Sequence, residues 1–252
     1  MKLVNFRDLG GIKNRNGQLV KHKRLLRSGE VVNVDQEVID QLVQDYQLKQ
    51  IVDLRSEEEF IERPDDKIPG VDLINLQIMK GAKTNGFSLQ DFARIGDVSF
   101  VDDHMLNVYH DVVSNPISQE YYGNFLQLLI DTPDGSTLFH CFAGKDRTGI
   151  AAALILWLLD VENEEVVKDY LQTNVDRKVA NDEIIDGFRR EGYEGDELLA
   201  LAVSLEVKEE YLEIVQNFIN QNYGSVKKYA EEELNFDQSK VDKLQDLYLV
   251  SD

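Results

Sequence analysis

The chain has 252 residues, and 47 Asp and Glu against 27 Lys and Arg give it a formal net charge of −20. That charge excludes nucleic-acid binding driven by overall electrostatics, and a hydrophobic content of 42% excludes an intrinsically disordered chain. Cys141 is the single cysteine, so no internal disulfide can form. Because the first residues form no signal-peptide core and no window reaches the roughly 18 apolar residues of a membrane span, we expect a cytoplasmic chain without stable membrane insertion, leaving secretion by a non-standard route open.

Short apolar runs bounded by turn residues predict strands of a sheet in the first third of the chain. They cover residues 17–20, 25–29 and 50–55. Between the last two, residues 35–46 carry apolar side chains at helical spacing behind a possible Asp35 cap, which predicts a β-α-β crossover. We therefore expect an α/β fold with a central, mainly parallel sheet flanked by helices.

The next segment has a different character. Residues 77–103 are weakly periodic and contain Gly81, Gly86 and Gly96, a composition typical of an excursion over a site rather than of core. We expect a lid-like insertion at about residues 77–107.

The second half of the chain is predicted to be mostly helical. A helix over 121–130 precedes a short buried strand over 136–140, and the almost continuously apolar residues 147–159 predict a central helix buried on most sides. Further helices are expected over 163–173, 179–191, 198–205, 208–223, 225–234 and 240–249. Since no repeat or linker is found, we expect one domain, 1–252, with a helical C-terminal third.

The segment that carries chemistry is HCFAGKDRTG, residues 140–149, between a predicted strand and a predicted helix. A loop that leads into a helix N-terminus gathers unpaired backbone N–H groups and the positive end of the helix dipole, so it is suited to bind an anion. The same field should lower the pKa of the Cys141 thiol below about 8.5 and favour the nucleophilic thiolate. Arg147 can bind two oxygens of a tetrahedral anion, and Gly144 lets the backbone fold tightly around it.

This segment resembles the Cys-x5-Arg signature of protein tyrosine phosphatases. Further segments are similar to the bacterial family of atypical tyrosine and lipid phosphatases, namely NFRDLGG at 5–11, LRSG at 26–29, VDLRS at 52–56 and the C-terminal helices through 223–225. The resemblance implies a phosphatase-type fold and a metal-independent phosphomonoester hydrolase, above all a protein tyrosine phosphatase with possible dual-specificity or phosphoinositide activity. Its substrate would be a phosphorylated protein or a phosphoinositide-type molecule, and its product inorganic phosphate.

The resemblance also implies roles for individual residues. Cys141 attacks phosphorus to form a cysteinyl-phosphate intermediate, while Arg147 and the backbone N–H groups of the loop hold the equatorial oxygens. His140 tunes the thiolate, and Thr148 helps it to leave in the second step. The phosphate-binding residues are Phe142, Ala143, Gly144, Lys145, Asp146 and Arg147. No metal or other cofactor is implied, because the loop itself supplies the positive charge.

A general acid must protonate the leaving oxygen. The resemblance implies Asp146, although a carboxylate here can equally serve the dipole of the following helix. Asp102 and Asp103, at the end of the lid-like segment, are the reserve candidates. Lys145 is expected at the rim of the site, where it adds positive charge.

Three residues outside the loop complete the candidate set. Arg55 follows a predicted strand, so it is placed at the carboxyl edge of the sheet, where open α/β sheets bind ligands. The alternative is that Arg55 pairs with the acidic run 57–59, which is otherwise expected to be a solvated face. The family pattern places Arg27 and Asp8 near the same pocket. The remaining histidines, His22, His104 and His110, show no metal-ligand spacing.

Two other functions stay open as alternatives. A rhodanese-like sulfurtransferase also uses a cysteine at an anion-binding turn, but the spacing of Cys141 and Arg147 and the Gly-Lys-Asp sequence between them fit phosphatases better. A module that binds phosphorylated ligands without turnover is the other alternative.

Overall fold

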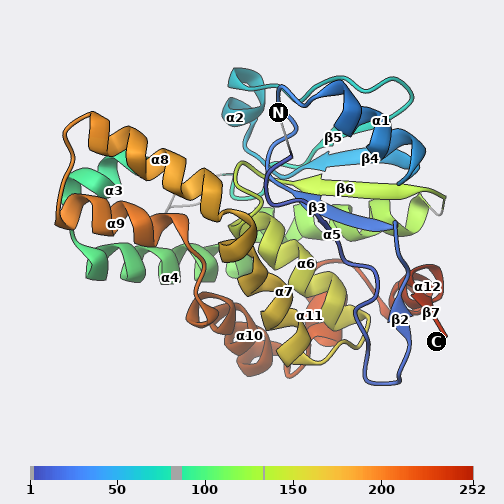
Figure 1. Cartoon of the computed structure of the whole chain (residues 1–252). Helices are drawn as coiled ribbons and strands as arrows, with labels where there is room; N and C mark the ends of the chain where they lie inside the picture. Colours follow the sequence, from blue (N-terminus) through green and yellow to red (C-terminus); the bar gives the residue numbers. More distant parts are fainter. Residues whose placement is uncertain (1–2, 81–86, 133, 252) are drawn as a thin grey trace.

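The computed structural model describes residues 3–80, 87–132 and 134–251, and it shows a five-stranded sheet between layers of helices (Figure 1). The strands are β1 (Arg7–Asp8), β2 (Leu19–Val20), β3 (Leu25–Ser28), β4 (Leu48–Asp53), β5 (Asp72–Asn75), β6 (Ser136–His140) and β7 (Leu249–Val250). The helices are α1 (Gln36–Gln44), α2 (Glu57–Glu62), α3 (Leu89–Ile95), α4 (Val98–Ser114), α5 (Pro116–Asp131), α6 (Asp146–Leu158), α7 (Asn163–Asp176), α8 (Lys178–Arg190), α9 (Asp196–Leu205), α10 (Glu209–Tyr223), α11 (Val226–Glu233) and α12 (Gln238–Tyr248). The expected α/β fold with a helical C-terminal third is confirmed.

The strand order of the main sheet is β1-β3-β6-β4-β5. Strands β3, β6, β4 and β5 are parallel, and only the edge strand β1 runs antiparallel to its neighbour. The last residues of three neighbouring strands, Ser28, His140 and Asp53, are paired in register. Because parallel strands end at the same edge, this register brings the segments that follow β3, β6 and β4 together at one place.

Alternating side chains of the strands face two separate cores. Leu26, Ile51 and Leu138 pack with Leu42 of α1 on one face of the sheet. Their chain neighbours, which include Val52 and Phe139, face the larger core, where α5 and α6 cover the sheet (Figure 1). Every residue of α6 from 148 to 158 is buried, which confirms the predicted central helix.

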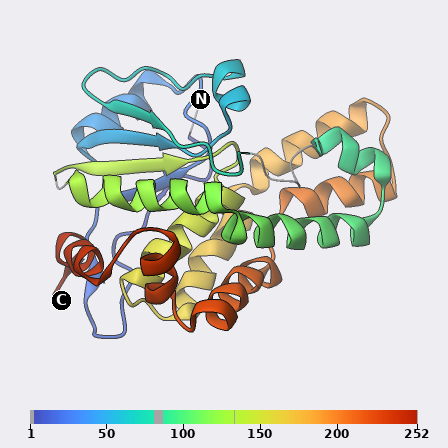
Figure 2. The same ribbon diagram turned by 180° about the vertical axis from the view of Figure 1, so that it is seen from behind.

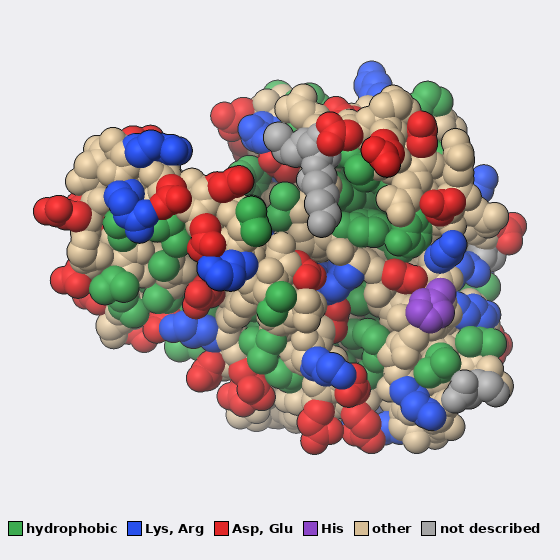
Figure 3. All heavy atoms as spheres, in the orientation of Figure 1, with side chains coloured by type: hydrophobic (Ala, Val, Ile, Leu, Met, Phe, Trp, Pro, Cys, Tyr) green, Lys and Arg blue, Asp and Glu red, His purple; other side chains and the backbone are tan. Residues whose placement is uncertain are grey.

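Four helices project together from one side of the molecule. Figures 1 and 2 show α3, α8, α9 and the first part of α4 side by side, away from the sheet. Their small core contains Ala93 of α3, Phe188 of α8, and Leu201 and Leu205 of α9. The surface is indented between these projecting helices and the part that contains the sheet (Figure 3). The loop after β6 lies at the base of this indentation.

Some sequence predictions differ from the structure. Residues 17–20 do not join the main sheet: β2 pairs instead with β7, where Leu19 opposes Val250, and this pairing ends the last helix at Tyr248. The segment 77–107 contains α3 and the first half of α4, since capping side chains at both N-termini outweigh the weak periodicity. Gly81 and Gly86 lie outside the described residues.

Strand β5 and helix α2 are not predicted from the sequence. Within the described ranges, no helix combines the length and apolarity needed to cross a membrane.

Gly123 should be intolerant of a side chain because α5 packs directly on another segment. A Cβ at this position would lie 2.2 Å from the backbone oxygen of Leu234, so we expect Gly123→Ala to destabilise the fold by about 1–3 kcal/mol. In Gly187→Ala the nearest atom to the new Cβ is the Arg190 Nη2, 4.0 Å away, and the gain in helix propensity should stabilise α8 by about 0.5–1 kcal/mol. Urea unfolding of both variants measures the difference, and equal stabilities would contradict this packing.

Candidate active site

The loop between β6 and α6 lines a pocket of about 260 Å³. The loop residues that face this pocket are Cys141, Phe142, Ala143, Lys145, Asp146 and Arg147. Gly144 lies at the back of the loop, where φ is +65° and a Cβ would be 2.2 Å from the backbone oxygen of Ser28. Only glycine combines this left-handed conformation with so close an approach to β3.

Three side chains donate hydrogen bonds to the backbone carbonyls of the loop. The Asn5 Nδ2 donates to the oxygens of Ala143 (3.2 Å) and Gly144 (2.8 Å), and the Arg27 Nη2 also donates to Gly144 O (3.0 Å). Arg177 Nη1 donates to Ala143 O at 2.9 Å. Because the C=O and N–H of a peptide unit point in opposite directions, these bonds also fix the direction of the following N–H groups.

The pKa of Cys141 is lowered from its ordinary value, although the thiol is only 2% exposed. Burial alone raises the pKa, but the positive charge of Arg147 and hydrogen bonding from Thr148 lower it more. The Thr148 hydroxyl is buried and has no hydrogen-bond partner elsewhere in the described ranges, so it is free to donate to the sulfur. Cys141 therefore has the electrostatic environment of a nucleophilic thiolate.

His140 is fully buried between two acceptors. Its Nδ1 lies 3.1 Å from the Cys141 carbonyl oxygen, and its Nε2 lies 2.7 Å from the Asp65 Oδ2. A carbonyl and a carboxylate only accept, so both contacts are hydrogen bonds only when the ring carries two protons. Burial lowers the pKa of His140, but the Asp65 and Asp53 carboxylates raise it above its ordinary value. Both contacts and the raised pKa favour a protonated ring one residue before Cys141.

Arg147 is oriented by Glu59, the third residue of α2. Two parallel bonds join them, from Nη1 to Oε2 (2.6 Å) and from Nη2 to Oε1 (2.9 Å). The Glu59 carboxylate also accepts from the backbone N–H of Ser56 in a capping box, so the start of α2 fixes its position. Burial raises the pKa of Glu59, but the bond with Arg147 outweighs it and lowers the pKa to about 2. The fork of Arg147 is therefore held by a permanently ionised carboxylate.

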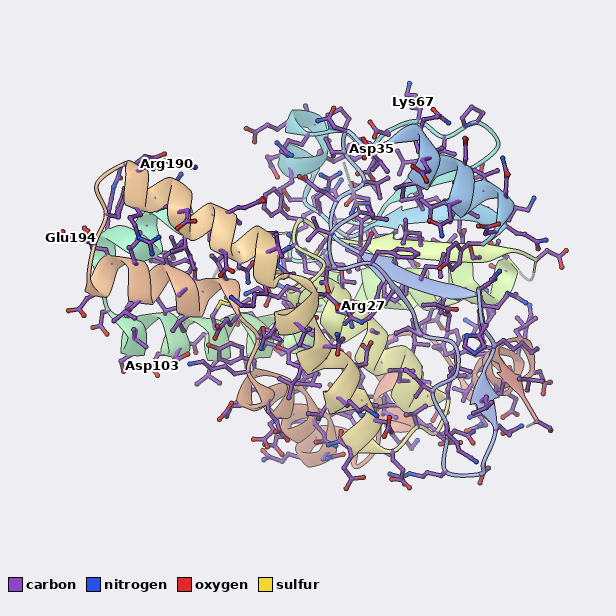
Figure 4. All side chains as sticks on the ribbon, in the orientation of Figure 1. Arg27, Asp35, Lys67, Asp103, Arg190 and Glu194 are labelled. Carbon is purple, nitrogen blue, oxygen red and sulfur yellow. The ribbon has the colours of Figure 1, made fainter. Side chains whose placement is uncertain are left out.

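Asp146 is the first residue of α6 and takes part in a tyrosine network. Its Oδ1 accepts from the Tyr109 hydroxyl at 2.7 Å, and the Tyr170 hydroxyl lies 2.7 Å from that of Tyr109. Asp102 and Asp103, the reserve candidates for the general acid, lie outside the pocket. Asp102 binds the Lys208 Nζ (2.6 Å) and the Tyr211 hydroxyl (2.5 Å) and does not line the pocket, while Asp103 is exposed on the outer side of α4 (Figure 4).

Lys145 is not at the rim, contrary to the sequence prediction. The residue is only 5% exposed, and its Nζ donates to the backbone oxygens of Ser204 (2.7 Å) and Glu206 (3.1 Å) at the end of α9. The Asp146 Oδ1 lies 3.4 Å from the same nitrogen. Lys145 therefore ties the loop to the projecting helices.

Unlike Lys145, Arg55 and Arg27 do not line the pocket; both are fully buried. Arg55 Nη2 donates to Asp53 (2.9 Å) and Asp65 (2.7 Å), so it pairs with acids other than the run 57–59. Burial lowers the pKa of Arg27 to about 10 despite the Asp169 carboxylate, 2.6 Å from its Nη1. Figure 4 shows Arg27 in the centre of the molecule. It supports the loop rather than the substrate.

Asp8 is also outside the site. Its carboxylate accepts from the backbone N–H groups of Gly10 (2.8 Å) and Lys23 (2.8 Å), which organises the N-terminal turn.

Asp53, Asp65 and His140 place potential metal-ligand atoms within 4.8 Å of one another. Arg55 already donates to both carboxylates, so this buried cluster needs no further cation to balance its charge.

Most of the pocket wall comes from residues that the sequence analysis did not single out. They are Glu59, Met79, Phe87, Leu89, Phe92, His104, Met105, Val108, Arg177, Ile184, Ser204 and Leu205. Phe87, Phe92 and Phe100 surround the His104 ring, whose pKa is lowered by burial. The only sequence signal for Glu59 is the capping-box pattern Ser-x-x-Glu, which predicts a helix start but not an arginine partner.

The family model described as "Tyrosine phosphatase family" matches residues 1–250. A protein of Cupriavidus necator named "Putative tyrosine-protein phosphatase" is 30% identical over 238 residues, which cover 93% of this chain and 83% of that protein. The triple specificity protein phosphatase PtpB of Mycobacterium tuberculosis is 26% identical over 192 residues, which cover 68% of this chain and 66% of PtpB. A tyrosine-protein phosphatase of Nostoc commune is 47% identical over a shorter stretch of 53 residues, 21% of this chain and 18% of that protein.

The hydroxyl of Thr148 should be needed for the low pKa of Cys141. In Thr148→Val the thiolate loses one hydrogen-bond donor, so the pKa of Cys141 should rise by roughly 1 to 2 pH units. The pH dependence of iodoacetamide alkylation reports this value, and mass spectrometry detects it cleanly because the chain has a single cysteine. Thr137→Val, at a buried threonine of β6 that binds Gln50 instead, is the matched control. An unchanged pKa in Thr148→Val would show that the hydroxyl does not reach the sulfur.

Proposed function

The chain belongs to the tyrosine phosphatase family and is a phosphatase of that type, and we propose that Cys141 and Arg147 carry its catalysis. As a phosphatase it acts on a phosphorylated substrate and releases inorganic phosphate. The observation that carries the residue assignment is a single buried thiol of lowered pKa, beside a guanidinium, at the mouth of an anion-binding loop. This combination supports nucleophilic attack on phosphorus without a metal ion.

The proposed reaction has two displacements. The Cys141 thiolate attacks phosphorus and the substrate oxygen leaves, which forms a cysteinyl-phosphate; water then attacks the same phosphorus and the thiolate leaves. Arg147, held by Glu59, and the inward N–H groups of the loop stabilise the charge on the equatorial oxygens. Thr148 stabilises the departing thiolate in the second step. The positive charge of His140 favours the thiolate throughout.

Asp146 is our proposed general acid. It lines the pocket next to the nucleophile, and the bond from Tyr109 occupies its Oδ1, which leaves Oδ2 to carry the proton. The same carboxylate also lies in the first turn of α6, so its charge interacts favourably with the helix dipole.

We propose phosphotyrosine as the principal substrate group. The aromatic rings of Phe87, Phe92 and Phe142 line the pocket together with His104, and flat apolar walls of this kind suit an aryl ring better than a short alkyl chain. Activity on phosphoserine, phosphothreonine or phosphoinositides is the second candidate, favoured by the similarity to a triple specificity phosphatase. Nucleic acids are poor candidates, because the net charge of −20 opposes their approach.

We also propose that the chain acts as one phosphatase domain, located in the cytoplasm, in which the segment 77–107 covers the site. Its described members Met79, Phe92 and Met105 form one wall of the pocket. Their contribution supports a lid-like role.

Hydrolysis of 4-nitrophenyl phosphate tests the proposed mechanism. We expect the reduced wild-type protein to be active in excess chelator, and both Cys141→Ser and vanadate to abolish turnover, because each removes the attack of the thiolate on phosphorus. Vanadate competes for the anion site. A wild-type protein that binds phosphate without turnover would favour a recognition module, and a persulfide formed on Cys141 with thiosulfate would favour sulfurtransfer.

The assignment of Asp146 makes a separate prediction. Asp146→Asn should lower kcat for phenyl phosphate about 10²- to 10⁴-fold, since its leaving group needs a proton, and should affect 4-nitrophenyl phosphate far less. Asp103→Asn, which removes an exposed carboxylate on the outer side of α4, should leave both rates unchanged. Equal losses on the two substrates in Asp146→Asn would place the acid elsewhere and make Asp102 the next residue to test.

A further inference from the structure

Arg177 joins α7 to α8 and lines the catalytic pocket together with Cys141 and Arg147. The residue is only 5% exposed. Its Nη1 donates to the Ala143 oxygen on the loop, two residues after the nucleophile. The guanidinium therefore contacts the loop at the wall of the same pocket.

Arg177 lacks the counter-ion that the other buried arginines have. Arg27 pairs with Asp169, Arg55 with Asp53 and Asp65, and Arg147 with Glu59. Across the described ranges, Arg177 forms no ion pair, and its Nε is buried without any hydrogen-bond partner.

An unpaired buried cation is costly, and a single neutral carbonyl does not replace its hydration. The absence of a carboxylate is notable in a chain with 47 Asp and Glu. Burial lowers the pKa of Arg177, while the nearby charges of Cys141 and Asp146 oppose that effect. A guanidinium stays protonated even so, because its ordinary pKa lies far above neutrality. The pocket therefore contains a positive charge that no carboxylate among the described residues balances, on a side chain whose Nε has no partner there.

The other two cationic side chains of the pocket are already committed. Arg147 forms two bonds with Glu59, and Lys145 is bound to two backbone oxygens and lies close to Asp146. We propose that Arg177 is a second anion-binding group, which binds a second anionic group of the substrate close to the phosphate that is hydrolysed. This inference rests on the proposed function, and it defines the preferred substrates as molecules with two anionic groups a few bonds apart.

Three small substrates test the inference: phenyl phosphate, 1,3-phenylene bis(phosphate) and 3-carboxyphenyl phosphate. We expect the KM of at least one of the two substrates that carry a second anionic group to be about ten- to hundred-fold below that of phenyl phosphate. A factor of this size is the usual effect of charge-assisted hydrogen bonds. The bisphosphate has a two-fold statistical advantage, so only a larger preference counts. A preference limited to the bisphosphate identifies the second group as phosphate, and one limited to the carboxyphenyl ester identifies it as carboxylate.

The variant Arg177→Gln should remove this preference: the KM of each doubly anionic substrate should rise to that of phenyl phosphate measured with the same variant. Lys178→Gln is the matched control, because it removes one positive charge at the next residue, where the side chain is 70% exposed and pairs with Asp182. It should retain the preference. No preference in the wild type, or a preference that persists in Arg177→Gln, overturns the inference.

Binding measured by calorimetry in the Cys141→Ser protein makes the result independent of turnover. Tighter binding of a doubly anionic ligand than of phenyl phosphate supports the inference even where Arg177→Gln disturbs the loop, and equal binding overturns it. If the wild type does not hydrolyse phenyl phosphate at all, the proposed function fails instead, and the calorimetric comparison still decides the role of Arg177.

Discussion

The site depends on one constraint: the backbone carbonyls of the loop between β6 and α6 need hydrogen-bond donors from other parts of the chain. Asn5, Arg27 and Arg177 supply these donors from the N-terminal segment, β3 and the α7–α8 junction. The donors are themselves linked, because Arg7 binds the Asn5 side chain and shares Asp169 with Arg27. The N–H groups can converge on an anion only while this support holds the peptide units in place. The main sheet also helps to place the loop, since its register brings the last residues of β3, β4 and β6 together.

Charge balance explains how so many ionised groups are tolerated below the pocket. Asp53, Arg55, Asp65 and His140 form a fully buried row in which every carboxylate faces a donor. The row ends at His140, the residue before Cys141, so it fixes the end of β6. At the pocket wall, Arg147 and Glu59 form another such pair of opposite charges. Against this background of paired ions, the guanidinium of Arg177 is an exception, because it pairs with no carboxylate in the described part of the chain.

The features predicted correctly from the sequence are those encoded by neighbouring residues. The loop from His140 to Gly149 and the buried helix α6 are contiguous patterns, so periodicity and residue type suffice to find them. The errors concern the direction of a side chain or a distant partner. Arg27 and Arg55 were placed at the correct edge, but alternation along the strand and the buried carboxylates direct them behind the loop. Lys145 and Glu59 are satisfied by residues 59 and 88 positions away, which no local pattern contains.

The wide sequence separation of the loop's supports has a consequence for protein synthesis. Asn5 precedes the loop carbonyls by 138 and 139 residues, and Arg177 follows one of them by 34. When the residues up to the loop have left the ribosome but Arg177 has not, the nascent chain therefore lacks a complete anion-binding site. At roughly 5–20 residues per second, the interval until α8 follows lasts seconds. During that interval Cys141 exists without the complete pocket, so the site forms late, as a property of the whole folded chain.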